Sequence, residues 1–77
     1  TLTVFPNPVQ GYMSVFMDGY DYCNLTLYDA TGRPALRQPL LTGWNSLDLS
    51  HVPPSLYFYE IKEEGRLLKS GKLVRVE

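Results

Sequence analysis

Apolar and polar residues alternate along most of this chain. The clearest apolar runs are Met13, Val15 and Met17, then Cys23, Leu25 and Leu27, then Tyr57, Tyr59 and Ile61, and finally Val74 and Val76. A period of two puts successive side chains on opposite faces of a β-strand, so each run predicts a strand with one apolar face. No stretch of eleven or more residues has apolar positions at helical spacing, which argues against crossover helices and a parallel sheet.

Turn-forming residues divide these runs at short and nearly regular intervals. They occur at Pro6-Asn7-Pro8, Asp18-Gly19, Asp29–Gly32, Thr42-Gly43, Pro53-Pro54 and Glu64-Gly65. Such spacing predicts an all-β fold, an immunoglobulin-like antiparallel β-sandwich of about seven short strands. The expected strands are Thr1–Phe5, Tyr12–Met17, Cys23–Tyr28, Ala35–Leu40, Trp44–Leu49, Leu56–Glu63 and Arg66–Val76. Gly71 interrupts the last strand and predicts a bulge or a short break.

The chain has 77 residues, so residues 1–77 are expected to form a single domain. Hydrophobic residues make up 44% and charged residues 19%, which is enough apolar material for a core and too little net charge for disorder. The chain begins with Thr1 and lacks a signal-peptide pattern, so we expect a fragment of a larger protein. No apolar run reaches the ~20 residues of a membrane helix, so direct membrane insertion is not expected.

Charge is unevenly distributed along the chain. The formal net charge of −1 provides no basic field that could hold a nucleic acid or an anionic membrane, and neither partner is predicted. Residues 1–61 carry two basic and five acidic side chains, whereas residues 62–77 carry five basic and three acidic ones. The last strand is therefore locally cationic.

Few residues could catalyse a reaction. His51, the single histidine, lies beside Ser50 and near Asp48, but working triads assemble from separate elements, and these residues are neighbours at an expected turn. Cys23 alternates with Leu25 on the core-facing side, so we expect a buried thiol rather than a nucleophile. We predict that the chain is not an enzyme and has no catalytic residue.

No metal or cofactor site is predicted. Cys23 is the only cysteine, which excludes a disulfide within the chain and a structural zinc site. Asp18 and Asp21 could in principle ligate calcium, but they lack the dense carboxylate spacing of a calcium loop. Asn24-Leu25-Thr26 matches a glycosylation acceptor over three residues and lies in an expected strand, so we treat the match as chance.

Aromatic side chains leave a second interpretation open, a carbohydrate-binding or adhesion β-sandwich module. The rings that could line a sugar platform are Tyr20, Tyr22, Tyr28, Trp44, Tyr57, Phe58 and Tyr59. In a chain this small, such rings more often form the core, where each buries ~150–250 Å².

Several short motifs follow one another in a fixed order. They are Val4–Val9, Leu25–Asp29 with Gly32-Arg33, Gly43-Trp44-Asn45, Leu47–Ser50, Leu56–Tyr59 and Lys72–Val76. In this order they resemble the type A C-terminal sorting domain of the type IX secretion system, also called the Por secretion system, with its PNP start, YDxxGR middle and KLVxV end. The resemblance covers essentially the whole chain. Ser55 stands where the family's LPxGxY segment has glycine, so the backbone there must avoid positive φ or accept strain.

The resemblance implies a non-catalytic C-terminal secretion signal. Similar domains of Bacteroidetes direct the cargo protein that precedes them through the outer-membrane type IX translocon. A sortase-like protease then removes the domain, and the cargo is attached to the cell surface or released. The implied partners are the translocon, the protease and the cargo domain of the same precursor. The implied localisation is the periplasm in transit, then the cell surface or the medium.

The residues expected to meet the translocon or protease lie at the chain's end and in the middle motif. They are Lys72, Leu73, Val74, Arg75 and Val76, with Gly32 and Arg33. An exposed terminal strand can be recognised through its backbone edge and alternate side chains. The alternative is that Val74 and Val76 complete the core while the charges keep an edge strand from aggregating.

Other motif residues have expected structural roles. Pro6, Asn7 and Pro8 should stiffen the entry to the domain, because proline fixes φ. Asp29 should accept hydrogen bonds in a tight turn that ends with Gly32 at positive φ. Tyr57 is also expected to be a structural residue rather than a contact for a partner. For Arg33 two roles stay open, an anchor for this turn through Asp29 or a guanidinium for a partner carboxylate.

Overall fold

The computed structural model describes all of residues 1–77 and contains only β-strands and their connections. The strands are β1 (Leu2–Phe5), β2 (Tyr12–Tyr28), β3 (Pro34–Asp48), β4 (Ser55–Glu63) and β5 (Arg66–Arg75). All strand pairs are antiparallel, which confirms the all-β, antiparallel part of the predicted fold class. The single five-stranded sheet is not specifically the expected immunoglobulin-like sandwich. The structure offers no helix that could cross a membrane.

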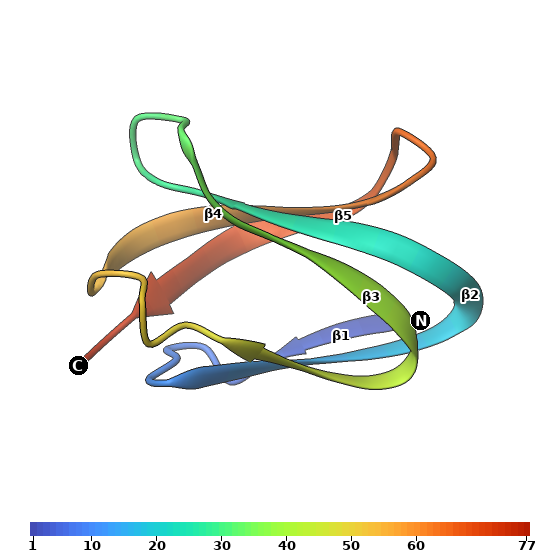
Figure 1. Cartoon of the computed structure of the whole chain (residues 1–77), viewed down its shortest axis with the longest axis horizontal. Helices are drawn as coiled ribbons and strands as arrows, with labels where there is room; N and C mark the ends of the chain where they lie inside the picture. The colour runs from blue at the N-terminus through green and yellow to red at the C-terminus, as the bar shows by residue number, and fades with distance from the viewer.

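The five strands form one sheet that curls into two layers (Figure 1). The first layer contains β1, residues 12–17 of β2 and residues 43–48 of β3. The second layer contains residues 22–28 of β2, with residues 34–41 of β3 on one side and β4, then β5, on the other. Both long strands thus cross from one layer to the other.

The expected count of seven strands was wrong, because two of the expected turns are bends within continuous strands. Gly19 has a φ of +92° in β2, and Gly43 has a φ of +98° in β3. Side chains with a Cβ disfavour this region, so glycine is the residue that lets each strand turn sharply while its pairing continues on both sides. Glycine in a loop and glycine in a strand bend look alike in the sequence.

Asn45 locks the bend of β3. Its Nδ2 donates to the carbonyl oxygen of Leu41 at 2.9 Å and to that of Val15 at 3.2 Å, and its Oδ1 accepts from the Leu41 amide at 2.9 Å. Through these bonds one side chain connects the backbone on the two sides of the bend in β3 and joins it to β2. The asparagine of the Gly43-Trp44-Asn45 motif therefore serves the fold.

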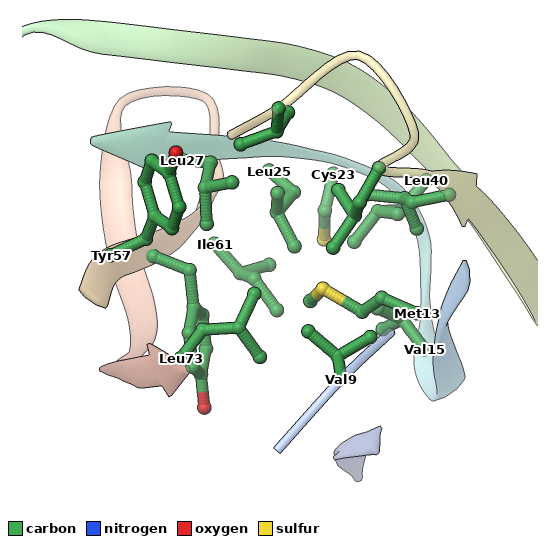
Figure 2. Packing of buried hydrophobic residues seen from close by; sticks show 14 of the residues in the cluster. Val9, Met13, Val15, Cys23, Leu25, Leu27, Leu40, Tyr57, Ile61 and Leu73 are labelled. Carbon is green, nitrogen blue, oxygen red and sulfur yellow. The ribbon is translucent and has the colours of Figure 1, made fainter. Parts of the chain in front are cut away.

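The hydrophobic core lies between the two layers (Figure 2). It consists of Val9, Met13, Val15, Met17, Cys23, Leu25, Leu27, Leu40, Leu47, Leu49, Val52, Tyr57, Tyr59, Ile61 and Leu73. The predicted inward runs of β2 and β4 are confirmed. The phase expected for the last strand was wrong, because Leu73 points into the core and Val74 is 39% exposed.

Gly71 makes room for a neighbouring ring and marks neither a bulge nor a break. It pairs directly with Tyr59, and a Cβ at position 71 would lie 2.8 Å from the Tyr59 Oη. The register shift between β4 and β5 falls instead between Ile61 and Lys62. Glycine inside a strand often permits such a close approach.

Candidate functional site

The C-terminal part of the outer edge of β5, from Lys72 onward, is closed by the segment that follows β1. Asn7 Nδ2 donates to the Lys72 carbonyl at 3.0 Å, and Asn7 Oδ1 accepts from the Val74 amide at 3.1 Å. The Val9 amide then donates to the Val74 carbonyl, and the Val76 amide donates to the Val9 carbonyl, both at 2.8 Å. The asparagine side chain thus completes the pairing that a neighbouring strand would give.

This pairing gives the Pro6-Asn7-Pro8 motif a role beyond the stiff entry expected from its prolines. Both the Phe5-Pro6 and the Asn7-Pro8 peptide bonds are cis. Asn7 and Val9 occupy the backbone groups of the terminal strand that an incoming strand would need. A partner could add a strand along Lys72–Val76 only after displacing this segment.

The five terminal residues expected to meet a partner differ in their surroundings. Leu73 is fully buried, whereas Lys72 and Val74 are exposed on the outer face of the second layer. The Arg75 guanidinium turns back to the chain, where its Nε donates to the Leu49 carbonyl at 3.1 Å and its other end donates to the Val76 carbonyl. Val76 is half-buried beyond the end of β5. Lys72 and Val74 are therefore the two side chains free to meet a partner.

Apolar side chains of β4 continue this outer face. Phe58 lies between Tyr28 of β2 and Lys72 of β5, and Leu56 pairs with Val74. Phe58 is 39% exposed and Leu56 38% exposed. Neither Leu56 nor Phe58 was among the residues expected to meet the translocon or the protease. From Leu56 to Tyr59 both phases of the alternation are apolar, so an apolar outward phase could have been expected there.

The loop between β2 and β3 is built on Asp29, as expected. Its Oδ1 accepts from the Thr31 hydroxyl at 2.6 Å, the Thr31 amide at 2.9 Å and the Arg33 amide at 3.0 Å. These hydrogen bonds, with that of the Thr31 hydroxyl foremost, lower the pKa of Asp29 below its usual range. The Arg33 side chain is exposed and makes no hydrogen bond or ion pair. The guanidinium is therefore available to a partner.

Gly32 has a φ of +86°, which confirms the prediction for this turn. Gly32→Val is expected to lower the free energy of unfolding by about 1 kcal/mol or more, because a β-branched residue is disfavoured at positive φ. An added Cβ at this position meets no atom within 4 Å, so the effect would come from the backbone alone. Thermal melts of Gly32→Val and Gly32→Asn measure it, since asparagine tolerates this conformation better. Equal melting temperatures for both variants and the parent would contradict this assignment.

The same loop rises over the outer face of the second layer (Figure 1). Together with β4 and β5 it encloses a shallow hollow of about 590 Å³. Gly32 lies on one side of this hollow, and Phe58 and Gly71 lie on the other. The structure thus brings the middle motif and the terminal strand to one surface, although they are far apart in the sequence.

Positive charge is confined to this half of the molecule. All seven Lys and Arg residues lie in the second layer or its loops. Only two of them form ion pairs, Lys62 with Glu60 at 3.6 Å and Arg66 with Glu63 at 3.1 Å. Arg33, Arg37 and Lys72 are exposed and form no ion pair, and Lys72 places its positive charge beside Phe58 on the outer face.

Tyr57 fixes the connection between β3 and β4. Its hydroxyl donates to the Pro53 carbonyl at 2.5 Å, while its ring is buried in the core. Burial raises the pKa of the Tyr57 phenol. Ser55 opens β4 without a positive φ, so of the two expected alternatives the backbone avoids this conformation and no strain arises.

The side chains considered for catalysis are not assembled into a reactive group. Asp48 accepts a hydrogen bond from the Ser50 amide at 2.8 Å, and hydrogen bonding from Ser50 lowers the Asp48 pKa. No hydrogen bond links His51 to either residue. Cys23 is fully buried, as predicted, and burial raises the pKa of its thiol.

The acidic residues show no clustering that suggests a cation site. No group of three or more His, Cys, Asp or Glu side chains lies close enough together to hold a metal ion. Asp18 and Asp21 therefore belong to no such group. Asn24 is half-buried within β2.

These features define a small β-domain with one face that combines positive charge and apolar groups. The chain belongs to the family of secretion system C-terminal sorting domains, whose family model matches residues 3–76. The family provides C-terminal sorting signals for type IX secretion, which confirms the resemblance drawn from the motifs. No curated protein matches the chain.

Proposed function

We propose that this chain is the non-catalytic C-terminal export signal of a longer precursor, and that the type IX outer-membrane translocon reads it as a folded domain. The observation that carries the proposal is the outer face of the second layer. There the unpaired Lys72 and the loop that bears Arg33 flank the exposed Phe58. Apolar contact at the centre with charges at the margin is the usual arrangement of a protein interface.

The closed edge of β5 favours recognition through side chains. Asn7 and Val9 already pair with the backbone that strand addition would use. On the opposite edge of the second layer, Pro34 and Pro39 remove backbone donors from β3. A translocon that reads the outer face needs neither edge, so the domain can stay folded while it is recognised.

The proposed route runs through the periplasm to the cell surface. Residues 1–77 form one sorting domain behind a cargo domain of the same precursor. After transit, a sortase-like protease removes the domain by cutting upstream of Thr1, and the cargo stays on the surface or is released. The domain is a ligand of the translocon and a substrate of the protease throughout.

A reporter fusion tests this function. A periplasmic reporter joined through a flexible linker to residues 1–77 is expected to reach the cell surface or medium of a bacterium with an active type IX system. The same reporter without the domain, or with it in a translocon-deficient strain, should stay in the periplasm. Immunoblots of cell fractions measure the distribution, and loss of the domain from the surface reporter shows cleavage. Retention of the complete fusion in the periplasm of the active strain would refute the proposal.

A further inference from the structure

The outer face of the first layer is unlike that of the second. Its outward side chains follow from the strand register and are Thr3, Phe5, Tyr12, Ser14, Phe16, Trp44, Ser46 and Asp48. Every apolar member of this set is an aromatic ring, and no Lys or Arg belongs to it. The one carboxylate, that of Asp48, is held by the Ser50 amide.

Three of these rings form a group centred on Trp44. The Phe5 ring meets the Trp44 ring edge-on, with centroids 5.5 Å apart and planes at 90°. The Phe16 ring lies 5.0 Å from the Trp44 ring at 54°. The rings come from three adjacent strands, so the sheet fixes their relative positions. We call Phe5, Phe16 and Trp44 the aromatic platform.

Hydroxyl groups lie beside the platform. Ser14 pairs with both Phe5 and Ser46, and Thr3 pairs with Phe16. The face therefore presents rings next to small groups that both donate and accept hydrogen bonds. Trp44 remains 69% exposed despite its ring contacts. Packing accounts for Tyr57 and Tyr59, which lie in the core, but leaves most of the Trp44 ring in water.

We propose that the aromatic platform binds neutral oligosaccharides, a function beyond the proposed role in sorting. The C–H face of a sugar ring can stack on Trp44, while its hydroxyls bond to Ser14, Ser46 or Thr3. The absence of cations from this face disfavours acidic polysaccharides and anionic lipids. The lack of aliphatic side chains on the face separates it from the mixed apolar surface around Phe58.

Tryptophan fluorescence tests this binding directly, because Trp44 is the only tryptophan. The probes are cellohexaose, mannohexaose and xylohexaose, titrated against the folded domain. We expect at least one to produce a saturable change in emission, with a Kd of about 0.1–1 mM, as suits a shallow open site. Polygalacturonate should bind more weakly than the neutral probe.

Variants locate the site independently of the fluorescence. With affinity electrophoresis on the same sugar, Trp44→Ala is expected to weaken binding about tenfold and Phe5→Ala severalfold. Phe58→Ala changes a comparable exposed ring of the second layer and should leave binding unchanged. Thermal melts confirm that each variant is folded. Export of the reporter fusion should survive Trp44→Ala, so failure of sugar binding and failure of the sorting function are distinguishable.

Several outcomes would overturn the proposal. These are no saturable response to any of the three sugars, binding that persists in folded Trp44→Ala, and a preference for polygalacturonate. A further one is a sedimentation coefficient that rises with protein concentration and is restored to the monomer value by Trp44→Ala. That result would assign the platform to contact between copies of the domain.

Discussion

Gly71→Ala is expected to lower the free energy of unfolding by about 2 kcal/mol, because position 71 has no room for a methyl group. A Cβ there would lie 2.8 Å from the Tyr59 Oη and 2.9 Å from Cε2, and the Tyr59 side chain is only 7% exposed. Since Tyr59 pairs directly with Gly71 in the ladder, the ring can move away only by disturbing the core or the β4–β5 pairing. Urea denaturation followed by circular dichroism measures the loss.

Gly11→Ala is the matched control. A Cβ at Gly11 meets no atom within 4 Å, and its φ is not positive. Alanine there should be neutral or stabilise by up to about 1 kcal/mol through the unfolded chain. Tyr59→Leu replaces the ring by a smaller side chain and should reduce the loss of unfolding free energy caused by Gly71→Ala. A double-mutant cycle measures this coupling. If the two alanine substitutions changed the free energy of unfolding equally, the Tyr59 side chain would be able to move away from position 71 without cost, and this prediction would be wrong.

The alternation of apolar residues predicted the inward faces of β2 and β4. In β2 the inward residues from Met13 to Leu27 keep the same parity across the bend, so both halves face one core. The alternation did not identify the inward residue of β5, where Leu73 and Val74 are adjacent and both apolar. There the register with β4, where Leu73 meets Tyr57, decides which residue points inward. That register depends on a partner strand and cannot be read locally.

The sequence could not predict what closes the terminal strand. The bond from Asn7 to the Lys72 carbonyl joins residues that are 65 positions apart. A Pro-Asn-Pro motif indicates restricted backbone geometry, but nothing local says which carbonyl its amide will meet. The residues of the family motifs have different roles in the structure. Asn7, Asp29, Asn45 and Arg75 support the backbone, whereas the Arg33 and Lys72 side chains have no structural partner.

Charge reversal at Arg33 and Lys72, the exposed and unpaired cations of the two motifs, is expected to abolish most export of the reporter fusion. Lys72→Glu replaces an exposed, unpaired cation that pairs with Phe58 in the ladder, and Arg33→Glu replaces one that directly follows the loop residues lining the same hollow. Each single change should reduce the surface fraction severalfold, and the double variant should leave nearly all of the reporter in the periplasm. Like charges facing each other across an interface are strongly unfavourable. Arg75 is left unchanged, because its guanidinium bonds to the Leu49 carbonyl and its loss would disturb folding.

A variant with the same charge change on the other face separates recognition from net charge. Thr3→Glu with Ser46→Glu adds two negative charges to the first layer, which equals the change made by one Lys→Glu substitution. Both positions are exposed and point away from the core, so this variant should fold and be exported like the parent. Circular dichroism and thermal melts establish that every variant is folded. If the folded Arg33→Glu and Lys72→Glu double variant reached the surface as efficiently as the parent, recognition would not depend on these charges. The apolar groups Leu56, Phe58 and Val74 would then be the part of the face left to carry it.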